Sequence, residues 1–295
     1  MIEPHAEPAV EPIEPFAGPA LLFCPADRRD RFHKAAAAAD VVILDLEDGV
    51  APADKEAARQ HLREVALDPE RTVVRINPAN TADHDLDLAA LSETAYRTVM
   101  LAKAEQAVDV SRLGALPLRV IALCETALGV VNALELAAEP ATVALMWGAE
   151  DLLVSLGGRS SRHPDGRYRG IALHALGQVL LAGGAHGRAV IDAVHLDIAD
   201  LDGLRIEAED AAASGFAAKA CIHPSQVSVV RRAFVPSPDE LGWATEVLRI
   251  AEGSAGVFTF KGRMVDQPIL SQARRLLRAA GGSQGSSSSP EPPRP

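Results

Sequence analysis

The stretch VVILDLEDGVAPADKEAAR, residues 41–59, contains one complete strand–loop–helix unit. Its opening aliphatic residues predict a buried strand, because short β-branched runs are typical of strands that are covered on both faces. A loop with Gly49 follows, and the Ala-rich residues from Pro52 onward are typical of a helix. The stretch therefore predicts a strand that leads through an acidic loop into a helix.

The same alternation recurs on both sides of this stretch, over about residues 20–234. Eight strands are predicted, at 20–24, 41–46, 72–76, 98–101, 118–123, 142–146, 190–196 and 217–222. Helices are predicted between and after them, at 27–37, 52–65, 84–91, 105–113, 127–137, 168–185, 201–214 and 224–234. Strand–helix alternation favours a parallel sheet, and eight repeats favour closure into a TIM-type (β/α)8 barrel. No G-x-G-x-x-G follows the first strand, which weakens a dinucleotide-binding interpretation.

The segments outside the alternation divide the chain further. Residues 1–19 repeat Pro and Glu without a basic segment before an apolar one, so they predict a disordered leader rather than a secretory signal. We expect the barrel over 20–236 and a C-terminal helical extension, or lid, over 237–280, with helices at about 239–254 and 269–280. The low-complexity residues 281–295 predict a disordered tail.

Composition excludes several classes of protein. The net charge of −11 argues against a nucleic-acid partner, because phosphate binding requires clustered Lys and Arg. The sequence contains no apolar run of about 20 residues, so no membrane-spanning helix is expected. Cys24, Cys124 and Cys221 each lie in or beside an apolar run, and their number is odd. We therefore expect buried free thiols and a reducing, cytoplasmic location.

Polar side chains follow the predicted strands at the end where barrel enzymes carry their catalytic groups. Asp45, Glu47 and Asp48 follow the second strand, Arg75 ends the third, Glu125 follows the fifth and Asp151 follows the sixth. This is an acidic mouth around one positive group, and it suits Mg²⁺, which takes carboxylate and water oxygens. Glu125 and Asp151 are the expected ligands. The alternative is that these acids only cap the helices that follow them.

Other titratable residues leave alternatives open. Lys103 and Lys219 lie in strand-like runs, and a desolvated lysine could serve as a Schiff-base nucleophile. An acidic mouth would keep such a lysine protonated, which argues against that chemistry. Asp45 is expected to pair with a nearby base such as Lys55 rather than with metal. The sequence contains neither H-E-x-x-H nor C-x-x-C, so it gives no support to a zinc site.

Seven motifs together resemble the citrate lyase beta-subunit-like branch of the aldolase/citrate lyase superfamily. They are LLFCPADRRDRFHKA, VVILDLEDGVAPADKEAAR, VVRINP, ALCETALGV, WGAEDL, CIHPSQ and MVDQP, and they cover about residues 20–280. The sequence is most similar to the stand-alone members that resemble citramalyl-CoA and β-hydroxyacyl-CoA lyases. The resemblance implies a TIM barrel, Mg²⁺, an acyl-CoA substrate and a homo-oligomer, a trimer or hexamer.

The resemblance also implies roles for individual residues. It makes Glu125 and Asp151 the magnesium ligands and Arg75 the group that holds the substrate carboxylate or carbonyl. It makes Glu47 and Asp48 acceptors for metal-bound waters. It implies that Asp266, in MVDQP, reaches a neighbouring subunit's active site as the acid/base. The segment from Pro25 to Phe32, including Arg28, is similar to the stretch that helps to hold the CoA adenine and phosphates.

These roles suit retro-Claisen cleavage, or the reverse condensation, of a β-hydroxyacyl-CoA such as citramalyl-CoA or 3-hydroxy-3-methylglutaryl-CoA. Mg²⁺ supplies Lewis acidity, Arg75 binds an anionic oxygen, and Asp266 handles the proton. One alternative is a citrate lyase beta subunit that acts on a citryl thioester of an acyl carrier protein. Another is a non-catalytic barrel subunit of a complex, although such a subunit has no physical need for acids at the barrel mouth.

Overall fold

The computed structural model describes residues 16–253 and 256–283. The chain divides into two compact units, and the boundary along the chain falls between Arg231 and Arg232. Each unit is described by itself. The predicted leader and tail fall outside the described residues over 1–15 and 284–295. Residues 16–19, expected to belong to the leader, are described. Phe16 packs against the barrel core, and the Pro19 carbonyl accepts a hydrogen bond from the Lys219 N–H (2.9 Å).

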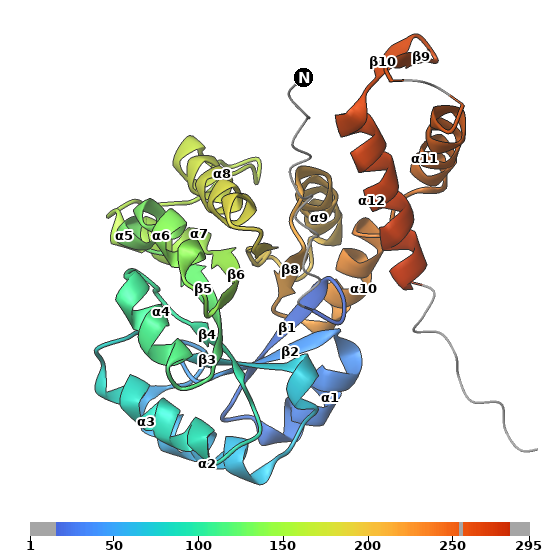
Figure 1. The fold of residues 1–295 in the computed structure, drawn as a ribbon. Helices are drawn as coiled ribbons and strands as arrows, with labels where there is room; N and C mark the ends of the chain where they lie inside the picture. The colour runs from blue at the N-terminus through green and yellow to red at the C-terminus, as the bar shows by residue number, and fades with distance from the viewer. Residues whose placement is uncertain (1–15, 254–255, 284–295) are drawn as a thin grey trace, which may run out of the picture. The chain divides into compact units, whose positions relative to one another are not determined.

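Eight parallel strands close into a barrel in sequential order, with the last strand paired to the first (Figure 1). The strands are β1 (Ala20–Pro25), β2 (Val41–Asp45), β3 (Thr72–Ile76), β4 (Thr98–Leu101), β5 (Arg119–Cys124), β6 (Thr142–Trp147), β7 (Ala189–Asp192) and β8 (Ala218–Cys221). The predicted (β/α)8 barrel is therefore confirmed. Strand boundaries differ from those predicted mainly at β7, which ends at Asp192 because residues 193–196 turn into the next loop.

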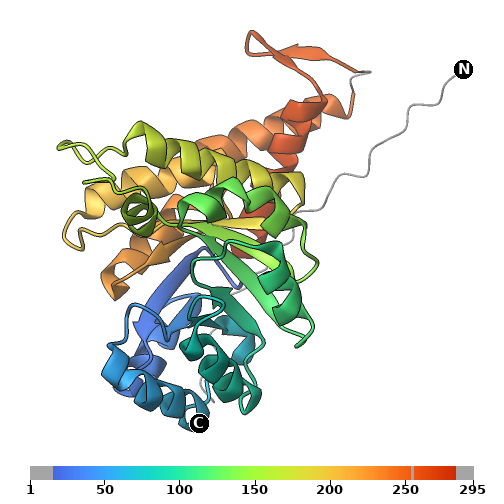
Figure 2. The ribbon, with the colours of Figure 1, turned by 90° about the vertical axis from the view of Figure 1, so that its left-hand side faces the viewer.

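Helices surround the strands of the first unit, as Figures 1 and 2 show. They are α1 (Phe32–Ala38), α2 (Lys55–Glu64), α3 (Ala82–Ser92), α4 (Ala107–Gly114), α5 (Ala127–Val131), α6 (Ala133–Ala138), α7 (Ala149–Ser155), α8 (Gly170–Ala185), α9 (Leu201–Ser214) and α10 (Pro224–Ala233). Short 3-10 turns precede α1 and α2, at Arg29–Arg31 and Pro52–Asp54, and a third, at Pro69–Arg71, precedes β3. The single helix predicted over 127–137 is broken at Asn132, whose side chain donates to the Glu105 carbonyl (2.8 Å). Helix α7 was not predicted.

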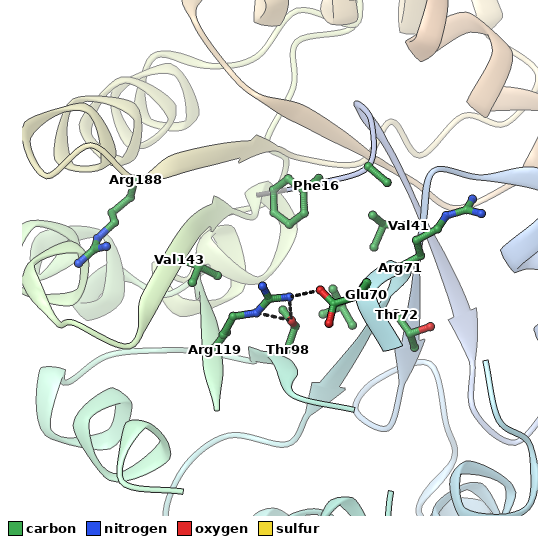
Figure 3. A pocket seen from close by; sticks show the side chains of 11 residues that line it. Phe16, Val41, Glu70, Arg71, Thr72, Thr98, Arg119, Val143 and Arg188 are labelled. Carbon is green, nitrogen blue, oxygen red and sulfur yellow. Dashed lines mark hydrogen bonds and ion pairs between the residues drawn. The ribbon is translucent and has the colours of Figure 1, made fainter. Parts of the chain in front are cut away.

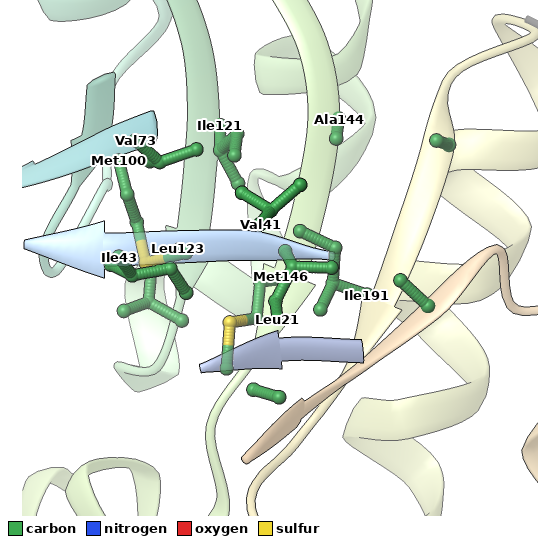
Figure 4. Close-up of a cluster of buried hydrophobic side chains, with 13 residues drawn as sticks. Leu21, Val41, Ile43, Val73, Met100, Ile121, Leu123, Ala144, Met146 and Ile191 are labelled. Carbon is green, nitrogen blue, oxygen red and sulfur yellow. The ribbon is translucent and has the colours of Figure 1, made fainter. Parts of the chain in front are cut away.

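The barrel interior is filled by apolar side chains from all eight strands (Figure 4). Successive residues of a strand point to opposite faces, so the interior positions recur every second residue. On β2 these positions are Val41 and Ile43, and on β5 they are Ile121 and Leu123. Close packing of such a layered interior makes the barrel a solid support rather than a pore.

The same two-residue period carries the site residues into the mouth of the barrel. After Val41 and Ile43 the next position on that face is Asp45, and after Ile121 and Leu123 it is Glu125. On β3, Arg75 occupies the corresponding position after Val73. The inward-facing positions of each strand are thus apolar within the barrel and polar at its carboxyl end, where the site lies.

A second group of charged residues lies on the opposite face of β7 and β8. The side chain of Lys219 is fully buried, and its Nζ donates to Asp192 Oδ2 (2.6 Å) and to the Ala193 carbonyl (2.8 Å). Asp192 Oδ1 accepts from Trp147 Nε1 (2.7 Å). Glu207 on α9 lies 3.4 Å from Lys219 Nζ and 3.1 Å from His195 Nδ1. This group joins three strands to α9.

The second unit is a helical pair with a short hairpin. Helix α11 (Pro238–Ala251) begins at a capping box formed by Ser237 and Glu240, and α12 (Gln267–Ser283) follows β9 (Phe258–Phe260) and β10 (Arg263–Val265). The two helices were predicted, with shorter or shifted ends, and the hairpin was not. The core of this unit consists of Ala244, Val247, Phe260, Val265 and Ala273.

Two further expectations concern the whole described chain. Cys24, Cys124 and Cys221 are all free and buried, as predicted. Burial raises the pKa of Cys24 to about 11 and that of Cys221 to about 12, so both remain thiols at neutral pH. Within residues 16–253 and 256–283, no helix combines the length and apolarity that crossing a membrane requires.

Glu207→Gln should destabilise the barrel by about 2–3 kcal/mol at pH 7, because Lys219 and Arg162 would lose a charged, partly buried partner. Burial opposes ionisation of Glu207, but hydrogen bonds from His195 and Arg162 outweigh it and lower its pKa to about 2. A depressed folded-state pKa stabilises the fold above the unfolded pKa of about 4.5, and this stability is lost as pH falls toward 2. Urea unfolding at pH 7, 5 and 4 should show the difference between variant and wild type shrinking on acidification. A constant difference would contradict this account.

Candidate active site

A cavity of about 400 Å³ opens at the carboxyl end of the barrel. One part of its lining is charged and includes Asp45, Asp48, Arg75, Glu125, Glu150 and Asp151. The other part is apolar and includes Phe23, Leu123, Met146, Trp147, Ala193, Val194, Leu196 and Ile222. A small-molecule site of this kind combines an apolar wall with a few convergent polar groups. The predicted strand-end residues are therefore brought together.

Arg75 is held by Asp45 through a bidentate ion pair. Its Nε donates to Asp45 Oδ1 (2.7 Å) and its Nη2 to Oδ2 (2.6 Å), while Nη1 lies 3.2 Å from Glu47 Oε2. Burial opposes the charged guanidinium, but the hydrogen bonds to Asp45 raise the pKa of Arg75 above its usual value. Asp45 pairs with a base, as expected, but that base is Arg75 and not Lys55, whose Nζ donates to the Leu46 carbonyl and to Asn77 Oδ1.

The acidic loop after β2 is folded around the same carboxylate. Asp45 accepts hydrogen bonds from the N–H groups of Glu47 (2.9 Å) and Gly49 (2.9 Å). A Cβ at residue 49 would collide with Asp45 Oδ2, so this close approach requires glycine. Asp45 is therefore a positioning residue: it fixes both the guanidinium and the loop that carries Glu47 and Asp48.

Glu125 and Asp151, the expected metal ligands, face the same cavity. Burial, together with the negative charge of Asp151, raises the pKa of Glu125 to about 8. Asp151 lies in the first turn of α7, directly beyond Gly148. A Cβ on Gly148 would lie 2.8 Å from the Cβ of Glu125, so glycine lets β6 pass close to this carboxylate. The two acids are neighbours in an environment that disfavours two uncompensated charges.

Lys103 joins these acids and was not predicted to have a structural role at the site. Its backbone N–H donates to Glu125 Oε1 (3.0 Å), and its Nζ donates to Glu47 Oε1 and to Asp48 Oδ2 (3.0 Å). Nζ also lies 3.6 Å from Asp151 Oδ1. Burial opposes its charge, but the hydrogen bond to Glu47 raises the pKa of Lys103 above its usual value. A Schiff base needs a free amine, and the ammonium groups of Lys103 and Lys219 are both held by carboxylates.

The site fits Mg²⁺. This ion is usually held by one or two carboxylates and completes its octahedron with water and substrate oxygens. Glu125 and Asp151 supply two carboxylates, and a divalent cation would compensate for the burial and the repulsion that raise the pKa of Glu125. Among the described residues, no group of three or more His, Cys, Asp or Glu side chains forms a closed metal cage. Two carboxylates leave coordination positions open for water and substrate, as is usual for Mg²⁺ in enzymes. A structural zinc site instead has four protein ligands.

The three residues expected to hold CoA differ in their position and exposure. Pro25 lines the cavity, at the end of β1. Arg28 is partly exposed and lies 3.4 Å from Asp30. Phe32 is fully buried in the core, where a ring cannot contact a ligand, so its predicted binding role is corrected to a packing role.

Asp266 belongs to the second unit. There it directly precedes α12, and its Oδ1 accepts a hydrogen bond from the Ile269 N–H (3.3 Å). Its catalytic role remains a prediction.

A different cavity, of about 410 Å³, lies at the amino end of the barrel (Figure 3). Its arginines are engaged by other groups: Arg119 donates to Thr98 Oγ1 (2.8 and 3.1 Å), and Arg188 donates to the carbonyls of Ala137 and Glu139 (both 3.1 Å). In barrel enzymes this end contributes to stability rather than to catalysis. The carboxyl-end cavity is therefore the candidate active site.

Comparison with known proteins identifies the family of the chain. A citrate lyase subunit beta-like protein of Mycobacterium tuberculosis is 60% identical over 265 residues, 90% of this chain and 96% of that protein. The mitochondrial citramalyl-CoA lyase of Homo sapiens is 30% identical, over 88% of this chain and 85% of that protein. The crystal structure of the protein CitE from M. tuberculosis, in complex with magnesium, acetoacetate and coenzyme A, matches with a TM-score of 0.87 at 60% identity, over 90% of this chain and 98% of that one. Residues 20–224 match the HpcH/HpaI aldolase/citrate lyase family, and the chain belongs to that family.

Proposed function

We propose that this protein is a magnesium-dependent lyase that cleaves, or forms, the carbon–carbon bond of a β-hydroxyacyl-CoA. The observation that carries the proposal is the juxtaposition of Glu125, Asp151 and Arg75 in one cavity with an apolar wall. The family contains carbon–carbon lyases, and the similar M. tuberculosis structure holds magnesium and coenzyme A. A carboxylate pair for a hard cation and a guanidinium for an anionic oxygen are the groups that retro-Claisen cleavage requires.

Each side chain of the site has a task in this reaction. Glu125 and Asp151 hold Mg²⁺, which supplies Lewis acidity toward the substrate oxygen that becomes a carbonyl. Arg75 donates from Nε and Nη2 to Asp45, and its Nη1 lies 3.2 Å from Glu47 Oε2, so a substrate carboxylate or carbonyl would bind through the N–H groups that these two acids leave over. Phe23, Leu123 and Met146 keep water away from the acyl group, which strengthens these electrostatic contacts.

Asp266 is proposed as the acid that protonates the carbon released as an enolate. A positioned carboxyl group contributes roughly 10²–10⁴-fold in such a step. The proposed arrangement places Asp266 of one subunit at the site of a neighbour in a homo-oligomer, a trimer or hexamer. The turn before β10, with Lys261 (φ 46°) and Gly262 (φ 76°), ends in the strand that leads directly to Asp266. The proposed lid therefore contains a short hairpin, β9–β10, directly before Asp266.

The proposed substrates are acyl-CoA thioesters of the citramalyl or 3-hydroxy-3-methylglutaryl type, in the cytoplasm. A citryl thioester of an acyl carrier protein is the alternative, since it has the same β-hydroxyacyl thioester centre and differs in the carrier and in a substituent of the acyl group. A non-catalytic subunit is disfavoured by Glu125, which is buried beside Asp151 and, among the described residues, accepts a hydrogen bond only from the neutral N–H of Lys103, because burying such a carboxylate costs free energy.

A substrate panel tests the proposal. Purified protein with Mg²⁺ is incubated with citramalyl-, malyl-, citryl- and 3-hydroxy-3-methylglutaryl-CoA, and acetyl-CoA release is followed by mass spectrometry. Cleavage of at least one thioester, abolished by a chelator, is the expected result. Release of free CoA without carbon–carbon cleavage would contradict lyase chemistry.

Asp151→Asn should weaken Mg²⁺ binding by at least about tenfold, because one of two anionic ligands is lost. Activity should fall with it, while the melting temperature stays close to that of wild type. Glu150→Gln is the matched control: Glu150 lies next to Asp151 in the same turn, but its carboxylate accepts from Ser161 Oγ (2.6 Å). Isothermal titration calorimetry should show a change of less than about threefold in this control. Equal losses in both variants would refute the ligand assignment.

Arg75→Lys should lower kcat/KM by about 100-fold although charge is conserved. A lysine cannot donate two parallel hydrogen bonds to Asp45 and still offer a third edge to the substrate. Affinity for coenzyme A itself should be retained, because the thioester handle binds elsewhere. Steady-state kinetics and a CoA binding assay check both statements, and near wild-type efficiency would exclude Arg75 from substrate recognition.

Asp266→Ala should be almost inactive and still bind Mg²⁺ and CoA. Mixed with Asp151→Asn under conditions that allow subunit exchange, it should regain part of the activity, because some sites then contain both groups. Native mass spectrometry must first demonstrate hybrid oligomers. Confirmed hybrids without activity would mean that Asp266 does not act across subunits.

A further inference from the structure

Lys103 contacts four carboxylates of the site, including both that are proposed to bind the metal. Its N–H binds Glu125, its ammonium binds Glu47 and Asp48, and the same ammonium lies 3.6 Å from Asp151. The backbone at residue 103 is left-handed, with φ of 48°, which is uncommon for a residue other than glycine, asparagine or aspartate. That conformation follows β4 directly, and the same residue turns its N–H toward Glu125 and its side chain toward Glu47.

The contacts of Lys103 divide the acids into two classes. Glu47 is buried and binds the two cations of the site, Lys103 and Arg75. Asp48 binds Lys103 as well. Glu125 receives only the neutral N–H of Lys103, and Asp151 forms the longer ion pair with the ammonium, at 3.6 Å against 3.0 Å for Asp48. Glu47 and Asp48 are thus the hydrogen-bonded partners of the ammonium, whereas Glu125 and Asp151 keep the weaker contacts and are the pair that a divalent ion can bind.

We infer that Lys103 is a built-in cation that confines divalent-metal binding to Glu125 and Asp151 and holds the affinity of that site down. This inference rests on the proposed function, because it assigns the metal to those two acids. Without the ammonium, Asp48 would lose its ion pair and Glu47 would keep only Arg75, so both could attract a divalent ion, and the site would gain one negative charge. Lys103 is therefore a positioning residue for the reaction, not a group that reacts.

The size of the effect follows from geometry. A metal bound to Asp151 at about 2.1 Å would lie at most about 6 Å from Lys103 Nζ, because Nζ and Oδ1 are 3.6 Å apart. Repulsion between one and two unit charges at about 6 Å weakens binding about tenfold even at the dielectric constant of water. Removing the ammonium should thus tighten divalent binding at least about tenfold.

The test measures Mn²⁺ affinity of the full-length protein by electron paramagnetic resonance, without substrate. Lys103→Met should bind Mn²⁺ at least about tenfold more tightly than wild type and lose most of its lyase activity. Lys103→Arg keeps the charge and should stay within about threefold of wild type. The exposed Lys34 provides the matched control. Lys34→Met removes an equal charge from α1, which contributes no side chain to the lining of the cavity.

The outcomes separate the inference from the proposed function. Unchanged or weaker Mn²⁺ binding by Lys103→Met would overturn the inference, because a merely structural ion pair would alter stability alone. If that variant does not fold, Lys103→Asn replaces it, since asparagine tolerates the left-handed backbone. Equal Mn²⁺ affinity in wild type and in the Asp151→Asn variant would instead refute the proposed metal site.

Discussion

Charge balance among buried carboxylates is the constraint on which the site depends. Asp45, Glu47 and Glu125 are each no more than 4% exposed, at one end of a barrel that is otherwise filled by aliphatic side chains. Isolated charges in such surroundings are too costly to keep, so each must be paired or bind a metal. Arg75 and Lys103 supply two positive charges, and the pairing of Arg75 with Asp45 fixes the loop that carries Glu47. These two cations do not neutralise the pair formed by Glu125 and Asp151. A divalent ion can supply the positive charge that this pair needs.

Much of this arrangement could be predicted from the sequence, because the two-residue period of a strand is visible in it. Once β2, β3 and β5 are recognised, the same period brings Asp45, Arg75 and Glu125 to one mouth. Lys103 could not be placed in this way. It follows its strand in a left-handed conformation, and neither the pattern nor the composition of VMLAKAEQ indicates that turn. The only available signal was a lysine directly after a strand that ends at an acidic mouth.

Other discrepancies have equally local causes. Helix α7 was missed because it is only seven residues long, too short for a helical period to emerge. The β9–β10 hairpin was missed because each strand has three residues, too few for a period to emerge. Phe32 was assigned to CoA by resemblance alone, and its full burial shows that the aromatic ring in this segment serves the fold. In contrast, the position of Asp266 depends on tertiary and quaternary structure, to which no periodic pattern points.

The central claim is that Glu125 and Asp151 together hold the divalent ion of a carbon–carbon lyase, while Glu47 and Asp48 remain with Lys103. Anomalous diffraction from crystals soaked in Mn²⁺ tests it most directly, because the peak reports the position of the metal alone. The account predicts one strong peak at about 2.2 Å from a carboxylate oxygen of Glu125 and of Asp151. A peak bound instead by Glu47 and Asp48, with Lys103 displaced, would contradict it.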